Sequence, residues 1–374
     1  MNNSSTDQNI EQIRNEVIVL LGKENFSELI EKLEVLVSLD DPWGMHYLAS
    51  CYSNGIGVEV NPEISNQLYI KAAERDFIDS QAVLGHKYLF GFQISKDISK
   101  GLELLKLAAS ANNAYSNLLL AEQYFEGNAI TAKDANIGLI YMEKAVELGD
   151  HRAKQKLAYF YSEGLYLAQD LEKSLNLNIE AADMGNEYAA LNAGNAFRYG
   201  RGTDIDYKKA MHYFQLASEA NIVMAIHNLG TLYFNGQGTE KNIDKAWEYY
   251  IRAASFGSYL SSSNLSKMQI NGDRGKKDIL KAISWSLVAI EQGSNEAIKD
   301  INTFKKDLTK DDHHQIIENL KFLSENGFPW AFLALHRIYL YGTFSEINLD
   351  LAKEFKEKAE KAEIKKQDYF SIQN

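Results

Sequence analysis

The side chains most able to bind a metal lie in one short stretch, Asp311-Asp-His-His314. Imidazole and carboxylate groups are common zinc ligands. These four residues are adjacent in the sequence, so at most two could reach one ion without help from elsewhere. The alternative is a solvated helix start, in which Thr309 or Asp311 would be the N-cap. We favour the helix start and expect neither a metal nor a cofactor.

A second candidate for chemistry is a pair of glutamates, Glu122 and Glu126. Their spacing places them one turn apart on a helix, with Glu163 expected nearby in the next structural unit. Paired carboxylates can act as general acid and base, but that role requires a pKa shifted by burial or by neighbouring charge. On an open surface both would stay solvated, so we favour an acidic site for a lysine or arginine of a partner.

No complete enzyme signature is present in the sequence. Gly-x-Gly pairs beginning at Gly55, Gly200 and Gly236 match part of a dinucleotide fingerprint, which must follow a strand. Each pair here follows an expected helix, so a structural turn is favoured. The single cysteine, Cys51, is either a small core residue or a reactive thiol, and we favour the core. We therefore expect no catalytic residues and no enzyme activity.

The elements that position these residues repeat along the chain with a period of about 36 residues. A glycine column contains Gly55, Gly91, Gly127, Gly164, Gly200, Gly236 and Gly272. An alanine column runs in step with it and contains Ala72, Ala108, Ala145, Ala181, Ala217, Ala253 and Ala289. An aromatic column three residues before the glycines contains Tyr52, Tyr88, Tyr124, Tyr161, Phe197 and Tyr233. Three columns in register over seven units indicate a tandem repeat.

Each unit is predicted to form two helices. In residues 224–257, apolar positions Ala225, Leu229, Leu232 and Tyr233 follow the spacing of an amphipathic helix. The stretch 235–238 breaks this helix, and a second helix follows and ends at Gly257. Glycine, asparagine or aspartate recurs at this terminal position, where a left-handed residue can close a helix. The alanine column is explained by close approach of adjacent helices, which a larger side chain would prevent.

The motif in these units resembles the Sel-1-like repeat, a relative of the tetratricopeptide repeat. It is Leu229-Gly230, Tyr233, Gly236-Gln-Gly238, Lys245-Ala246, Tyr249, Arg252-Ala253-Ala254 and Gly257 in one unit, and the pattern extends over about residues 42–363. The resemblance implies an all-α, right-handed superhelical solenoid of about nine helix pairs. Some secreted relatives have been linked to β-lactam binding, but these carry paired cysteines in each repeat and this chain does not.

We predict one continuous solenoid domain. Its expected parts are a disordered tail (1–7), a divergent helix-pair cap (8–41), seven repeats (42–294), an atypical repeat (295–328), a last repeat (329–363) and a tail (364–374). The atypical repeat lacks the Gly-x-Gly turn. Terminal units of a solenoid need a polar outer face for solubility, which explains a divergent cap.

In tetratricopeptide-like folds the first helix of each pair lines a concave groove, and the resemblance places the partner site there. The expected partner-binding residues are rich in the aromatic and arginine side chains typical of interfaces. They are Glu122, Phe125, Glu126, Tyr159, Glu163, Tyr188, Asn195, Arg198, Tyr199 and Phe234. The alternative for several of the aromatic residues is packing against the neighbouring helix.

The charge of the chain is −12, and it is uneven. Residues 1–150 hold 11 Lys or Arg and 22 Asp or Glu, a net charge of −11. An acidic surface disfavours nucleic acid and anionic membrane and favours a basic protein partner. One cysteine and no apparent signal segment favour the cytoplasm, with an exported protein trimmed of its signal as the alternative. We expect a monomer or a partner-bound complex.

These observations favour a non-catalytic adaptor or scaffold. The resemblance implies a bacterial source and a range that includes adaptors, regulators and immunity proteins that neutralise toxins. One alternative is an exported virulence factor that binds a host protein. A less favoured alternative is a binder of peptidoglycan or a small molecule, or a hydrolase.

Overall fold

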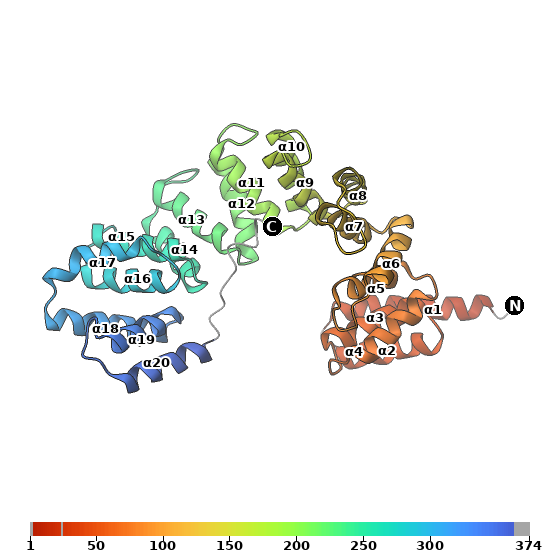
Figure 1. The fold of residues 1–374 in the computed structure, drawn as a ribbon, viewed down its shortest axis with the longest axis horizontal. Helices are drawn as coiled ribbons and strands as arrows, with labels where there is room; N and C mark the ends of the chain where they lie inside the picture. Colours follow the sequence, from red (N-terminus) through yellow and green to blue (C-terminus); the bar gives the residue numbers. More distant parts are fainter. Residues whose placement is uncertain (1–2, 24, 363–374) are drawn as a thin grey trace. The chain divides into compact units, whose positions relative to one another are not determined.

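The computed structural model describes residues 3–23 and 25–362, and all regular structure in that part of the chain is helical. The chain divides into two compact units, residues 1–170 and 171–374 (Figure 1). The sequence predicts one continuous domain, whereas this division falls between the two helices of the fourth repeat. The repeat columns do not mark that point, since Gly164 and Ala181 continue them on either side.

In the described part of the first unit nine α-helices follow one another. They are α1 (Asn3–Leu21), α2 (Phe26–Ser38), α3 (Pro42–Asn54), α4 (Pro62–Ala73), α5 (Ile78–Phe90), α6 (Ile98–Ser110), α7 (Ala114–Glu126), α8 (Ala135–Glu147) and α9 (His151–Glu163). Each helix packs mainly on the helices before and after it, as expected of stacked repeats. Helix α1 begins at Asn3, inside the stretch 1–7 that the sequence predicts to be a disordered tail.

The second unit continues the same alternation. Its elements are α10 (Leu171–Asp183), α11 (Glu187–Tyr199), α12 (Tyr207–Glu219), α13 (Val223–Asn235), α14 (Ile243–Ser255), α15 (Tyr259–Asn271), α16 (Ile279–Glu291), α17 (Ala297–Phe304), the 3₁₀ turn η1 (Lys305–Asp307), α18 (Lys310–Glu325), α19 (Trp330–Tyr341) and α20 (Leu349–Lys361). The predicted C-terminal tail, 364–374, lies outside the described residues.

The left-handed residues that end the helices lie where the repeat pattern predicts them. The seven column glycines and Gly342 follow the first helices with φ between +65° and +75°. The second helices are followed by Gly149, Gly185, Gly257 and Gly293, and by Asn112, Asn221 and Asp76, all with positive φ. Glycine adopts this conformation freely, and asparagine and aspartate tolerate it. The turn interpretation of the Gly-x-Gly pairs is therefore confirmed.

A column of aspartates and asparagines that sequence reasoning missed begins the second helices. In these residues the side-chain oxygen accepts a hydrogen bond from a backbone N–H of the first turn. They are Asn61, Asp97, Asp134, Asp206, Asn242, Asp278 and Asn348. The backbone of each also ties the second helix to the first. At Asp206, for example, the N–H donates to the carbonyl of Phe197 at 2.9 Å.

The alanine column lies in the core between helices, as the repeat pattern predicts. All seven of its members are fully buried. Aromatic residues of the two helices in a pair also stack, as in Phe197 on Tyr213 and Tyr233 on Tyr249, with ring centroids 5.7 and 5.5 Å apart. The repeats therefore share a small buried contact at the alanine column, and several add a stacked ring pair to the core.

The substitution Ala253→Leu tests this contact. Ala253 lies on α14 in a buried cluster with Val223 and Ile226 of α13. Three additional carbon atoms have no space there, so we expect a loss of about 1–3 kcal/mol in stability. Thermal denaturation should show the lower midpoint, and Ala220→Leu, at an exposed position after α12, serves as the control. Equal midpoints for Ala253→Leu and the parent chain would contradict a close contact at this column.

The atypical repeat differs because its first helix, α17, is only eight residues long. Helix α16 contacts α17, α18 and α19, so the last repeat packs partly on the repeat before the atypical one. The stretch 311–314 lies in the first turn of α18, which Thr309 begins. Its hydroxyl accepts from the Asp312 N–H at 3.2 Å, and the Asp312 carboxylate accepts from the Thr309 N–H at 2.8 Å. The helix-start interpretation of this stretch is confirmed.

Candidate functional site

The predicted partner-binding residues lie on first helices, five in each unit. Glu122, Phe125 and Glu126 lie on α7 and Tyr159 and Glu163 on α9. Tyr188, Asn195, Arg198 and Tyr199 lie on α11 and Phe234 on α13. We use the name first-helix face for the surface that the first helices of neighbouring repeats form side by side. This face is described separately in each unit.

In the first unit this face is a chain of paired charges and rings. Glu122 forms an ion pair with Lys156 of α9. Arg152 pairs with Asp150 at 2.6 Å and lies over the Tyr115 ring, 4.7 Å from its centroid. Burial would raise the pKa of Asp150, but the charge and hydrogen bond of the Arg152 side chain, together with the backbone N–H groups of Ala153 and Arg152, lower it below its usual range. The two ion pairs leave no net charge among these four side chains.

This pairing changes the interpretation of the glutamates. Glu122 already has Lys156 as its counterion, so it is not a vacant site for a partner's lysine or arginine. Glu126 and Glu163 are exposed, and Glu163 accepts a hydrogen bond from the Ser162 hydroxyl at 3.1 Å. Lys156 stands one residue before the repeat's leucine, a register that sequence reasoning did not assign to the face. Leu119 and Val83 stand at this register in other repeats, so a lysine here was the signal in the sequence that this position faces a charged group.

The prediction that Phe125 contacts a partner is wrong. Its side chain is 6% exposed and packs edge-on against Phe160 and stacked on Tyr166, at centroid distances of 4.9 and 4.7 Å. It also covers Gly138 of α8, where an added Cβ would lie 2.9 Å from the ring. Phe125 is therefore a core residue that joins α7, α8 and α9. Tyr159 is half-buried.

In the second unit the first-helix face carries a hydrogen-bonded network of one cation, Arg198, and neutral amide side chains. The Arg198 guanidinium donates to the Asn228 amide oxygen at 2.8 Å, and the Asn228 amide donates to Asn195 at 3.3 Å. Asn228 is a polar residue, yet it is only 5% exposed and lies on α13 among buried apolar residues. His227, its neighbour, is bonded through Nδ1 to the Ser261 hydroxyl of α15 at 2.8 Å. This network joins three first helices, and sequence reasoning missed Asn228.

Exposed aromatic side chains recur at the last residue of the first helix. Phe90, Tyr199 and Tyr341 occupy this register and are 51%, 58% and 69% exposed. Tyr188, at the start of α11, is 42% exposed, whereas Phe234 is half-buried beneath Lys241. Packing within the described residues does not account for the exposed rings. Rings of this kind are the side chains that most often anchor protein interfaces.

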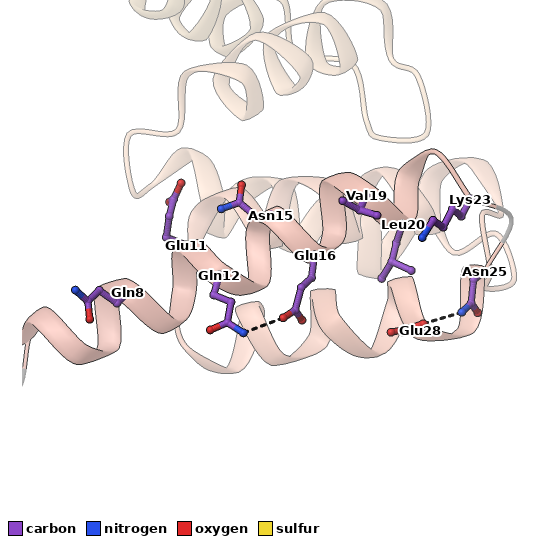
Figure 2. A pocket seen from close by; sticks show the side chains of 10 residues that line it. All are labelled: Gln8, Glu11, Gln12, Asn15, Glu16, Val19, Leu20, Lys23, Asn25 and Glu28. Carbon is purple, nitrogen blue, oxygen red and sulfur yellow. Dashed lines mark hydrogen bonds between the residues drawn. The ribbon is translucent and has the colours of Figure 1, made fainter.

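A cleft of about 790 Å³ lies along α1 and α2 in the N-terminal cap, and the sequence did not predict it (Figure 2). Glu11, Glu16 and Glu28 line it together with polar and apolar side chains. Glu16 accepts from Gln12 at 3.1 Å and pairs with Lys32 at 2.7 Å, and these partners hold the pKa of Glu16 below its usual value. An ionised carboxylate with a counterion is unsuited to act as a general acid.

The remaining candidates for chemistry are the single cysteine and possible clusters of metal ligands. Cys51 is a buried free thiol, and burial raises its pKa. It is therefore a core residue, as favoured from the sequence. Within residues 3–23 and 25–362, no three His, Cys, Asp or Glu side chains converge as metal ligands. No helix in those same ranges combines the length and apolar character that crossing a membrane requires.

Comparison with known families places the repeats. A family model described as the Sel1 repeat matches seven consecutive segments of the chain. They are residues 44–77, 78–113, 114–150, 151–186, 187–222, 223–257 and 261–294. These segments coincide with the seven units predicted from the glycine, alanine and aromatic columns.

The curated relatives are distant and longer than the matched region. An uncharacterized protein of Neisseria meningitidis is 28% identical over 202 residues, which are 54% of this chain and 42% of the relative. A chitin synthase regulator of Saccharomyces cerevisiae is 25% identical over 182 residues, which are 46% of this chain and 26% of the relative. The chain therefore spans less than half the length of these relatives.

Two solved structures are similar in fold. One is a protective antigen of uropathogenic Escherichia coli with an SLR fold, at a TM-score of 0.67 and 22% identity. That match covers 96% of this chain and 79% of the antigen. The other is a Sel1 repeat protein of Oxalobacter formigenes, at a TM-score of 0.53 and 27% identity, covering 64% of this chain and 96% of that one.

Proposed function

The chain belongs to the Sel1 repeat family, whose members are protein-interaction scaffolds, and we propose that it is a non-catalytic scaffold that binds one partner protein through its first-helix faces. The observation that carries this proposal is the set of exposed rings at one register of the first helices, Phe90 in the first unit and Tyr199 and Tyr341 in the second. Large exposed apolar side chains at a fixed register of the first helix are suited to contact with another protein.

The expected partner has a basic surface overall. The charge of −12, most of it within residues 1–150, attracts a basic protein at long range. The buried free thiol of Cys51 supports a reducing compartment, for which we propose the cytoplasm. The finer role, an immunity or regulatory protein that neutralises a toxin, rests on the family resemblance alone.

Affinity capture from the native organism, followed by mass spectrometry, tests the scaffold. We expect the intact chain to retain one protein and the double variant Tyr188→Ala, Tyr199→Ala to lose at least tenfold of it, because two interface rings are removed. The matched control is Ile140→Ala with Phe322→Ala. It removes from second helices two large apolar side chains that are each 65% exposed.

The two variants divide the possible outcomes. Retention by the tyrosine variant together with loss in the control would place the partner on the second helices and contradict the first-helix face. Circular dichroism of both variants confirms that each is folded, since all four side chains are exposed and contribute little to packing.

A further inference from the structure

We propose that Arg198 is a receptor for one carboxylate group of the partner protein. This inference deepens the proposed scaffold function and rests on it. It concerns a single contact on the face of the second unit, whereas the overall acidity of the chain concerns long-range attraction.

Arg198 departs from the repeat pattern, because its register is otherwise uncharged. The residues at the register of Arg198 in the other repeats are Ser53, Leu89, Phe125, Ser162, Phe234, Ile270 and Leu340. Its partner Asn228 stands at a register where asparagine recurs in three consecutive repeats, as Asn192, Asn228 and Asn264. The other repeats have Tyr47, Val83, Leu119, Lys156 and Ala334 there. Arg198 is thus the only charged residue at its register. Asn228, which accepts its hydrogen bond, is a polar side chain that is only 5% exposed. Repeat columns fix the fold, so a charged residue at a register that is otherwise uncharged points to a function.

The guanidinium of Arg198 is positioned before any partner binds. One of its five N–H groups donates to the Asn228 oxygen at 2.8 Å, and Asn195 accepts from the Asn228 amide. The guanidinium lies 5.1 Å from the centroid of the exposed Tyr199 ring. Its remaining donors are free to form the two parallel hydrogen bonds with which arginine holds a carboxylate.

The charge of Arg198 has no counterion within the described part of the chain. Its partners there are the neutral Asn228 amide and the Tyr199 ring, and no carboxylate lies within ion-pair distance. The first unit offers the contrast, because Glu122 and Asp150 on its face are each paired with a cation. A half-buried cation held by neutral groups is costly, and a partner's anion would offset this cost.

A carboxylate fits this site better than a phosphate. One guanidinium supplies one positive charge, which matches a single carboxylate, and the acidic chain as a whole repels more highly charged anions. The exposed rings of Tyr188 and Tyr199 predict apolar residues beside that carboxylate in the partner. An Asp or Glu side chain and a chain terminus share this chemistry.

The test is selection of peptides on the full chain. A displayed library of random nine-residue peptides is selected on the parent chain and depleted on Arg198→Gln. Selected peptides are then synthesised with each Asp or Glu changed to its amide, and separately with an amidated C-terminus. We expect one of these two changes to weaken binding to the parent at least tenfold and binding to Arg198→Gln less than twofold. Which change acts distinguishes a side chain from a terminus.

Two further variants make the result specific. Arg198→Lys should recover part of the binding, because it keeps the charge but not the paired donors. Arg201→Gln, at an exposed arginine in the following turn, should bind like the parent. The proposal is overturned if no peptide is enriched, if the selected peptides bind without any carboxylate, or if phosphorylated peptides bind more tightly than carboxylate ones. Partner capture that still depends on Tyr188 and Tyr199 in those cases would leave the scaffold function intact.

Discussion

Gly202→Ala is expected to destabilise the second unit by about 2–4 kcal/mol, more than the same change at Gly200 two residues earlier. Both glycines have positive φ, of 74° and 68°, so each substitution costs about 1 kcal/mol in backbone strain. At Gly202 the new Cβ would also overlap the Leu171 carbonyl group and lie 2.7 Å from the Glu172 nitrogen. Those atoms are backbone and cannot rotate away, so the overlap adds about 1–3 kcal/mol.

The overlap follows from how successive repeats pack. Leu171 is the first residue of α10, the second helix of the preceding repeat. Gly238 meets Tyr207, the first residue of α12, in the same way, with the added Cβ 2.6 Å from its carbonyl atoms. Gly57 likewise meets Phe26 at the start of α2. The second glycine of each Gly-x-Gly pair therefore permits contact between repeats, whereas the first only permits the turn.

Urea unfolding followed by tryptophan fluorescence measures the difference, since Trp247, Trp285 and Trp330 lie in the second unit. Gly200→Ala is the matched control, because its nearest neighbours would be an Ile205 side-chain atom and the Thr203 oxygen at 3.2 Å. Equal losses for the two variants would mean that the repeats separate freely and that strain alone explains both.

The repeat columns made the fold predictable, because glycine, alanine and aromatic residues each answer one steric requirement of a helix pair. Gly236 must take a left-handed turn, Ala253 must let two helices approach, and Tyr233 must stack on Tyr249. The column of N-cap residues, such as Asp206, has the same period and was equally visible in the sequence. It was missed because polar residues near a turn carry several meanings until the helix boundary is known.

The site was predictable only in part, because a helix position does not by itself decide between solvent and a neighbour. Phe125 and Tyr199 stand one position apart in the repeat register, yet the first is 6% exposed and the second 58%. Phe125 is buried because Tyr166, in the turn that follows α9 of the next repeat, stacks on it. Likewise, the partners of Glu122 and Arg198 are 34 and 30 residues away, and only the packing of consecutive first helices brings them together.

His227 makes the second unit sensitive to acid. Its ring bonds the buried Ser261 hydroxyl and lies 5.6 Å from the Tyr250 ring, and Tyr250 in turn donates to Thr231 at 3.2 Å. Burial, with the positive charge of Arg198 as a smaller cause, lowers the pKa of His227 to about 4. The same contact occurs in the first unit, where His46 bonds Ser80 at 2.9 Å and burial again lowers the pKa of the imidazole.

The sign of the effect follows from the two pKa values. An unfolded histidine titrates near 6.5, so between about pH 6.5 and 4 the unfolded state of the second unit binds a proton that the folded state does not. Stability is therefore complete above pH 6.5 and falls as the pH approaches 4. Since one pKa unit corresponds to about 1.4 kcal/mol, His227 alone should cost about 2–3 kcal/mol at pH 4.5.

His227→Gln should remove this acid sensitivity while keeping a polar side chain opposite Ser261. We expect the loss of stability between pH 7.5 and 4.5 to be about 2–3 kcal/mol smaller in this variant than in the parent, as measured by urea unfolding at the two pH values. His212→Gln, at an exposed histidine on α12, should keep the parent's pH dependence. If His227→Gln keeps it too, the imidazole is protonated in the folded chain. The positive charge beside Arg198 would then be doubled, which would require a counterion that the described residues do not supply.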